Sequence, residues 1–139
     1  HPFLCTPPPK STGREMFNQQ WLDHLLLKYP SISPPDIQCT LTHFTAKAIA
    51  LGVKQSTLPN GEIILCGGGA YNQFLVRLIA EALPQFTVYT SLSFHIAPTM
   101  IEPMAFAWLA KQTLEKKTGN LPCVTGASRK AILGGIYYP

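Results

Sequence analysis

The chain has 139 residues, of which 46% are hydrophobic and only 13% are charged, and its formal net charge is +4 at pH 7. This length suits one domain with a real core, and no apolar run approaches the roughly 18–20 residues that span a bilayer. The basic residues are dispersed, with adjacent pairs at Lys116-Lys117 and Arg129-Lys130, so we expect neither a nucleic acid nor a membrane as partner.

The first part of the chain predicts an extended lead-in and a helix. Pro7-Pro8-Pro9 is stiff and extended. Thr12 and Glu15 have the spacing of a capping box, so we expect a helix that starts there and stops at Tyr29-Pro30. Its apolar face would carry Phe17, Trp21, Leu25 and Leu26.

A second helix is predicted to begin after Ser33. Ser33 is the expected N-cap, and Pro34-Pro35 suits a first helical turn. The helix should end between Gly52 and Gln55. Apolar residues spaced by three or four positions indicate its buried face; they are Ile37, Leu41, Phe44, Ala48 and Leu51.

A strand that runs into three glycines is the most informative stretch. Residues 63–66 are four consecutive apolar residues, which suit a buried, parallel strand. Gly67, Gly68 and Gly69 then remove every Cβ where the chain must turn, so that the backbone can approach a flat ring or a phosphate. Asn72 is the expected N-cap of the next helix. Strand, glycine turn and helix N-terminus together predict a nucleotide-binding corner.

The remaining elements are a second strand and a long helix. Phe86 to Thr90 alternates and is rich in strand-forming residues. A helix is predicted from about Ile101 to Lys117, with Lys116 and Lys117 as cations of its last turn. Pro103 is tolerated because it falls in the first turn.

The order of these elements predicts an α/β fold with a small, mainly parallel sheet flanked by helices. We expect residues 1–139 to form a single domain or fragment. Residues 1–33 would be the lead-in and first helix, and residues 34–139 the nucleotide-side core. Two strands make a small sheet, and the low charge suggests a covered surface, so we expect part of a larger protein.

Four cysteines match neither a CxxC motif nor a zinc spacing; they are Cys5, Cys39, Cys66 and Cys123. We expect them to be small core residues of a protein in a reducing cytoplasm, without a metal site. Met104, Phe106 and Trp108 are likewise expected in the core rather than against a ligand.

The residues after the glycines distinguish the known kinds of nucleotide corner. A Walker A loop needs Lys-Ser/Thr, but here Ala70, Tyr71 and Asn72 follow. A Rossmann fingerprint needs a third glycine at Asn72 and an acid after the second strand, where Tyr89-Thr90-Ser91 has none. The adenosine corner of actin-like sugar kinases remains, and so does a tight turn that binds no ligand.

Four segments, in this order, carry a specific resemblance. They are Pro7-Pro8-Pro9-Lys10-Ser11-Thr12-Gly13-Arg14-Glu15 with Phe17-Asn18, then Cys66-Gly67-Gly68-Gly69 with Asn72, then Glu102 with Ala105-Phe106-Ala107-Trp108-Leu109-Ala110, and finally Asn120-Leu121-Pro122 with Val124-Thr125-Gly126-Ala127. Over nearly its whole length the chain resembles the anhydro-N-acetylmuramic acid kinase family.

The resemblance implies an activity and a fold. Such enzymes use ATP, Mg²⁺ and water to open the 1,6-anhydro bridge of anhydro-N-acetylmuramic acid and to phosphorylate it. The product is N-acetylmuramic acid 6-phosphate, within bacterial cell-wall recycling. The implied fold is two actin-like domains that close over a cleft, usually as a homodimer.

The resemblance also implies roles for particular residues. Gly67, Gly68, Gly69 and Asn72 would lie on the adenosine side of the cleft. Glu102 would face the sugar and orient the substrate or the attacking water. A carboxylate that satisfies backbone N–H groups at a helix start is the open alternative for Glu102. Lys10 and Arg14 could meet phosphate or sugar, or they could form a capped surface turn.

The chain departs from the family pattern in two ways. The first phosphate loop and the segment with the catalytic aspartate have no counterpart here, and neither Asp23 nor Asp36 stands in the expected context. The family also has Gly-Ile-x-x-Asp before the glutamate and an alanine after it, where this chain has His95 and Thr99 at the glycine and acid positions and Pro103 after Glu102.

We therefore expect the C-terminal half of such a kinase, without a catalytic residue of its own and inactive by itself. It would pair with the missing N-terminal half or form a homodimer. The alternative is a non-catalytic nucleotide-binding or dimerisation module, a remnant of such a kinase.

Overall fold

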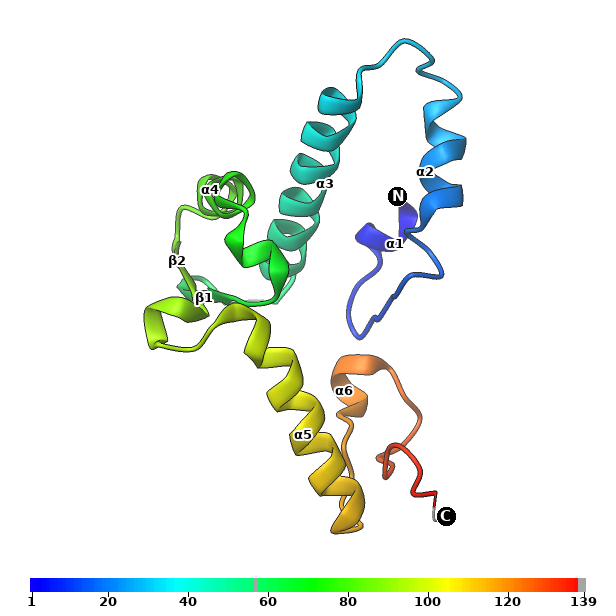
Figure 1. The fold of residues 1–139 in the computed structure, drawn as a ribbon, viewed down its shortest axis with the longest axis vertical. Coiled ribbons are helices and arrows are strands. Elements are labelled where there is room, and N and C mark those ends of the chain that lie inside the picture. The colour runs from blue at the N-terminus through cyan, green and yellow to red at the C-terminus, as the bar shows by residue number, and fades with distance from the viewer. Residues whose placement is uncertain (57, 138–139) are drawn as a thin grey trace.

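The computed structural model describes residues 1–56 and 58–137 (Figure 1). In chain order the elements are α1 (Pro2–Cys5), α2 (Gln19–Leu26), α3 (Pro34–Lys54), β1 (Gly61–Leu65), the 3₁₀ turn η1 (Gly68–Tyr71), α4 (Gln73–Ala82), β2 (Phe86–Thr90), the 3₁₀ turns η2 (Ser91–Phe94) and η3 (Pro98–Met100), α5 (Ile101–Leu114) and α6 (Pro122–Thr125). This order confirms the α/β class. Within the described ranges, none of the helices combines the length and apolar character needed to cross a bilayer.

The sheet has two parallel strands, as predicted. Gly61 of β1 pairs with Phe86 of β2, and Leu65 pairs with Thr90. The crossover between them contains α4, as a parallel pair requires. Ile63 packs against the core, whereas Ile64 points to the other face and is 50% exposed. The prediction of a fully buried strand is therefore wrong for the described part of the chain, because the helices that cover β1 lie on one face.

The core lies where α3, α4 and that face of the sheet meet. Its buried residues are Ala46 and Ala50 of α3, Ile79 of α4, and Leu83. Ile79 and Leu83 are completely buried. The alanine side chains of α3 are small, and larger apolar residues of α3, α4 and both strands pack around this cluster.

The buried face of α3 differs from the predicted stripe. Its fully buried residues are Thr42, Ala46 and Ala50. Phe44 instead turns toward α2, where its ring centroid lies 5.6 Å from that of Trp21. The helix therefore contacts neighbours on two sides: Ile49 and Val53 pack against the core, whereas Phe44 contacts α2.

Helix α2 begins later than predicted, and its N-cap is a different residue. Glu15 Oε1 accepts a hydrogen bond from the amide of Gly13 over 2.7 Å, whereas a capping box would use the amide of Thr12. These residues therefore form a turn, and the helix begins later, at Gln19. Its N-cap is Asn18, whose Oδ1 accepts from the amide of Trp21 over 2.9 Å.

Helix α3 begins and ends as predicted. Ser33 is its N-cap, because its hydroxyl oxygen accepts a hydrogen bond from the amide of Asp36 over 3.3 Å. The helix ends at Lys54, inside the predicted interval. Both predictions rested on bonds within one turn of helix, which the local sequence largely determines.

Helix α5 begins at Ile101, as predicted, but ends earlier than predicted, at Leu114. Lys116 takes a left-handed conformation with φ of 55°. The amide of Lys117 donates to Gln112 O over 2.8 Å and that of Lys116 to Thr113 O over 3.1 Å, which is the Schellman pattern of a helix end. Lys116 and Lys117 thus lie beyond the last turn that they were predicted to occupy.

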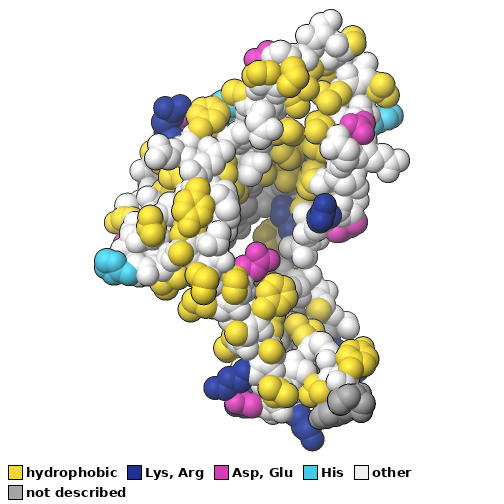
Figure 2. All heavy atoms as spheres, in the orientation of Figure 1, with side chains coloured by type: hydrophobic (Ala, Val, Ile, Leu, Met, Phe, Trp, Pro, Cys, Tyr) yellow, Lys and Arg dark blue, Asp and Glu magenta, His cyan; other side chains and the backbone are white. Residues whose placement is uncertain are grey.

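Helix α5 extends away from the sheet, with α6 and the C-terminal segment alongside it (Figure 1). None of its residues is buried: Met104 is 52% exposed, Phe106 64% and Trp108 53%. Apolar side chains accordingly appear on the surface of this part of the molecule (Figure 2). The expected core position of these three residues is wrong. The four cysteines are also exposed, as free thiols, and not in the core as expected.

Candidate functional site

The glycine turn begins where β1 ends. Gly67 has φ of 77°, a left-handed conformation that a residue with a Cβ adopts only under strain. Its amide donates a hydrogen bond to Pro98 O over 2.9 Å. This bond joins the turn to the loop that leads into α5.

The next two glycines have different surroundings. A Cβ added to Gly68 would meet no atom within 4 Å, so this residue borders open space. A Cβ added to Gly69 would lie 3.4 Å from Leu75 Cδ2 of α4. Gly68 therefore leaves room for another molecule, whereas Gly69 leaves room for the neighbouring helix.

Asn72 caps α4, as predicted. Its Oδ1 accepts hydrogen bonds from the amides of Phe74 and Leu75, over 3.1 and 3.2 Å. Because the carbonyl oxygen is used by the helix, a ligand would have to bond to the amide nitrogen of this side chain.

The structure brings the glycine turn and the start of α5 together around one hollow of about 390 Å³. It is lined by Gly67, Gly68, Thr99, Glu102, Pro103 and Phe106. We call it the glycine hollow. Of the five residues expected at the site, Gly67, Gly68 and Glu102 line this hollow, whereas Gly69 and Asn72 are not among its lining residues.

Glu102 lies in the first turn of α5. Among the described residues that line the glycine hollow, it carries the one charge. Its carboxylate can accept hydrogen bonds from hydroxyl or amino groups, and it would repel a phosphate. Thr99 adds a hydroxyl beside it. The lining therefore fits the uncharged part of a nucleotide or a sugar better than it fits phosphates.

The described residues do not fit a dedicated magnesium site. They contain no group of three or more His, Cys, Asp or Glu side chains that could hold a metal ion. Mg²⁺ favours oxygen ligands and is commonly held by one or two carboxylates together with substrate phosphates. In the glycine hollow Glu102 is the single such group among the residues described.

Other residues considered from the sequence have local structural roles. Lys10 Nζ donates to Phe3 O, Leu4 O and Gln55 Oε1 over 3.3, 3.0 and 3.1 Å, and so holds α1 against the end of α3. Arg14 lines a different hollow, beside α2 and α3.

The two aspartates and His95 stand apart from the lining of the glycine hollow. Asp23 accepts a hydrogen bond from Gln19 Nε2 over 2.7 Å, within α2. Asp36 accepts from Ser33 Oγ over 2.6 Å, at the start of α3. His95 is an exposed residue with φ of 60° that ends η2.

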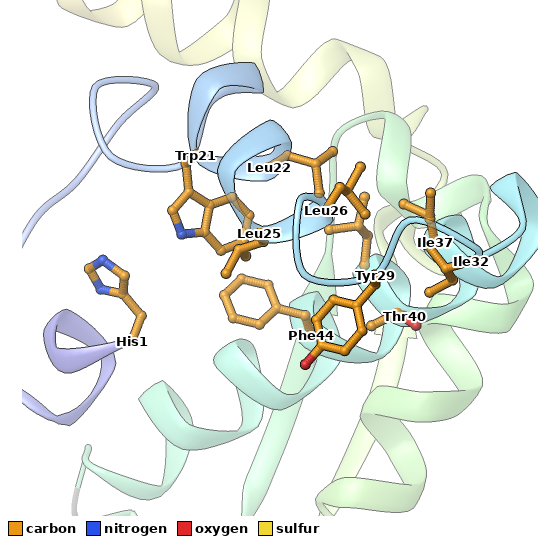
Figure 3. Close-up of a pocket in the computed structure, with 11 residues that line it drawn as sticks. His1, Trp21, Leu22, Leu25, Leu26, Tyr29, Ile32, Ile37, Thr40 and Phe44 are labelled. Carbon is orange, nitrogen blue, oxygen red and sulfur yellow. The ribbon is translucent and has the colours of Figure 1, made fainter.

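A groove of about 600 Å³ lies between α2 and α3 (Figure 3). Its lining is almost entirely apolar and aromatic: His1, Trp21, Leu22, Leu25, Leu26, Tyr29, Ile32, Ile37, Thr40, Leu41 and Phe44. The hydroxyl of Thr40 already donates to Asp36 O over 2.7 Å. The groove is therefore suited to apolar side chains, and the glycine hollow is the candidate site for a polar ligand.

Phe106 and Pro103 were not expected at a site. Phe106 follows Glu102 by one turn of α5, so both can face the same neighbour. That spacing was visible in the sequence. The sequence did not show that these two residues would line the same hollow as the glycine turn.

Comparison with known proteins identifies relatives of the whole chain. The sequence model of the family described as anhydro-N-acetylmuramic acid kinase matches residues 1–139. A protein of that name from Saccharophagus degradans is 52% identical over 140 residues, which cover 100% of this chain and 38% of the relative. Those from Coxiella burnetii and Pseudomonas syringae pv. tomato are 48% and 43% identical, over 99% and 98% of this chain and 37% of each relative.

The chain thus spans less than two fifths of the length of these relatives. The match extends across the glycine turn, the start of α5 and the C-terminal segment. On this ground, the chain belongs to the anhydro-N-acetylmuramic acid kinase family.

Proposed function

We propose that the chain is the C-terminal, nucleotide-side part of a kinase. With ATP and water the complete enzyme opens the 1,6-anhydro bond of anhydro-N-acetylmuramic acid and phosphorylates the sugar to N-acetylmuramic acid 6-phosphate. The observation that carries this proposal is that Gly67, Gly68 and Glu102, each expected at the site from the sequence, line one hollow.

Two sides of the site have separate roles in the proposal. Gly67, Gly68 and Gly69, followed by Asn72, form the adenosine side, where bare backbone allows close approach. Glu102 accepts a hydrogen bond from a hydroxyl group of the sugar and orients the sugar or the attacking water. The β1–α4–β2 unit belongs, on this proposal, to the second actin-like domain of the kinase.

On this proposal, phosphoryl transfer requires residues of the kinase that lie outside this chain. Phosphoryl transfer needs groups that hold the γ-phosphate with Mg²⁺ and a base that activates the nucleophile. Both aspartates of the chain accept local hydrogen bonds, Asp23 within α2 and Asp36 at the start of α3. We therefore propose that the chain by itself binds nucleotide weakly and transfers no phosphate, and that Mg²⁺ acts in the complete enzyme.

The exposed apolar surfaces suggest what covers the chain. Helix α5 carries Met104, Phe106 and Trp108 at more than half exposure, and large exposed apolar patches commonly mark interfaces. We propose that they contact the rest of the kinase or a second copy. We place the enzyme in the cytoplasm, because exposed free thiols such as those of the four cysteines persist in a reducing compartment.

A binding and activity experiment tests the proposal. The chain is titrated with ADP while its backbone amides are followed by NMR, with Gly52 of α3 as an internal control. We expect shifts at Gly67 and Gly68, none at Gly52, and no sugar phosphate by ³¹P NMR when ATP and anhydro-N-acetylmuramic acid are added. Absence of shifts at the glycines would support the alternative, an interaction module that binds no nucleotide. Formation of the sugar phosphate would refute the proposed inactivity of the chain.

A further inference from the structure

We propose that the groove between α2 and α3 holds an apolar helix from the part of the kinase that directly precedes His1 in the complete enzyme. This inference rests on the proposed function, in which residues 1–139 are the C-terminal part of a longer protein. The chain covers 38% and 37% of two relatives, so most of the length of such an enzyme lies outside it. The groove and the glycine hollow share none of their described lining residues, so the two sites can be tested separately.

The chemistry of the groove favours an apolar helix as its occupant. Its described lining residues include no Asp, Glu, Lys or Arg. Two of its polar groups are already bonded, because the Thr40 hydroxyl donates to Asp36 O over 2.7 Å and His1 Nδ1 accepts from the amide of Phe3 over 3.3 Å. An extended segment would leave its backbone amides and carbonyls unpaired against this lining, whereas a helix satisfies them internally.

The rim of the groove is open in the described part of the chain. Tyr29 and Leu25 both line the groove, yet Tyr29 is 61% exposed and Leu25 is 37% exposed (Figure 3). Exposed apolar side chains that share a concave surface are typical of an interface. A helix laid along the groove with its apolar face inward would cover both side chains.

The position of His1 brings the preceding residues to this groove. His1 lines the groove, and its ring centroid lies 5.1 Å from that of Phe17. Lys10 fastens α1, which follows His1, to the end of α3: its Nζ donates to Leu4 O over 3.0 Å and to Gln55 Oε1 over 3.1 Å. A segment joined to His1 would therefore start beside the groove, and this tether would raise its effective concentration there.

A second copy of the chain fits the groove less well. In a symmetric dimer the same surface meets itself, so one groove would face another and both would stay unfilled. Helix α5, with the exposed Trp108, could instead enter the groove of a neighbouring copy. That contact would be head-to-tail and would lead to rings or fibres. A helix of the same polypeptide fills the groove without further association.

The test uses a synthetic peptide with the sequence that precedes the matched stretch in the Saccharophagus degradans relative. A length of about 20 residues allows a helix of more than five turns. The chain has two tryptophans, so Trp108→Phe leaves Trp21 of the groove as the reporter. We expect its emission to shift to the blue when the peptide covers it. Amide shifts by NMR should map to α2 and α3 and leave Gly67 and Gly68 unchanged.

Two variants distinguish the groove from other apolar surface. Tyr29→Ala should weaken peptide binding by about fivefold or more, as expected for an aromatic anchor of an interface. Leu27→Ala is the matched control, because Leu27 ends α2 and is 77% exposed but is not among the described lining residues. It should change the affinity by less than about twofold. Both side chains are mostly exposed, so both variants should fold, which circular dichroism checks.

The possible results separate this inference from the proposed function. An unchanged Trp21 emission at millimolar peptide, or equal losses in the Tyr29 and Leu27 variants, would overturn the inference. Self-association of the chain that Tyr29→Ala abolishes, measured by analytical ultracentrifugation, would also overturn it, because a second copy would then occupy the groove. ADP shifts at Gly67 and Gly68 without peptide binding would leave the nucleotide role standing. Peptide binding without ADP shifts would support this inference and count against the nucleotide role alone.

Discussion

The amide of Gly67 donates a hydrogen bond to the carbonyl oxygen of Pro98, with 2.9 Å between the two atoms. Pro98 is completely buried and opens η3, after which α5 begins. The bond therefore sets the position of the glycine turn relative to Glu102 in the first turn of α5. Two parts of the chain that form one hollow are thus joined by a backbone hydrogen bond.

Gly68→Ala should weaken adenine nucleotide binding while preserving the fold. A Cβ at Gly68 meets no protein atom within 4 Å, and its φ lies outside the left-handed region, so the folded chain accommodates alanine. The methyl group would instead occupy the space proposed for the ligand. We expect a loss of affinity for ADP of at least about tenfold, with unfolding free energy unchanged or raised by about 0.4–1 kcal/mol, measured by calorimetry and urea unfolding.

Gly52→Ala is the matched control for that variant. Gly52 lies in α3, and an added Cβ there also meets nothing within 4 Å. It should raise the unfolding free energy by about 0.5–1 kcal/mol and leave ADP binding unchanged. Equal binding by the two alanine variants would argue against a ligand at Gly68.

Asn72→Ala should lower the unfolding free energy by about 1 kcal/mol, because two amides of α4 lose their acceptor. The effect should reach the whole chain, since α4 carries the buried Ile79. Urea unfolding with an unchanged slope measures it. Asn72→Asp keeps a capping oxygen and should retain stability, so a loss of ADP affinity in this variant would indicate a ligand contact through the amide nitrogen.

Lys116→Gly should raise the unfolding free energy by about 0.5–1 kcal/mol. Lys116 has φ of 55° at the end of α5, where a residue with a Cβ is strained and glycine is preferred. Lys117→Gly removes the same charge from a residue without positive φ, and it should give no gain. Thermal unfolding of the pair distinguishes backbone strain from charge, and an equal gain in both variants would contradict the strain argument.

The carboxyl group of Glu15 should have a pKa below its ordinary value. The cause is hydrogen bonding to the ionised form, chiefly by the amide of Glu15 itself, then by that of Gly13 and by the Thr12 hydroxyl. A lowered pKa in the folded state means that the turn is stabilised above the unfolded pKa and loses this stabilisation as pH falls through the folded pKa. NMR titration of Glu15, compared with the chain unfolded in urea, checks the direction; equal values would contradict it.

Local chemistry made several elements predictable from the sequence. Ser33 and Asn72 cap α3 and α4 through bonds to amides within the next three residues. The alternation in Phe86–Thr90 predicted β2 with its observed bounds. These features depend on residues close in sequence, so the interactions that stabilise them depend little on the rest of the fold.

Predictions from local patterns were wrong where one side chain or one helix face had two alternative partners. Glu15 was predicted to cap a helix, but its carboxylate bonds to the amide of Gly13 and forms a turn. The stripe on α3 predicted one buried face, but the helix packs Ala46 and Ala50 against α4 and turns Phe44 toward α2. Which face was the more deeply buried depended on the neighbouring helices.

Strand β1, the glycine turn and the N-cap of α4 were predictable from residues close together in the chain, and four motifs indicated the family. The tertiary structure decided that Gly67 and Gly68 share a hollow with Glu102 and Phe106. The glycines are positioned by the pairing of β1 with β2, whereas Glu102 is positioned by the buried Pro98, whose carbonyl oxygen accepts the hydrogen bond from Gly67. Such contacts join residues distant along the chain, and they form only when the chain folds.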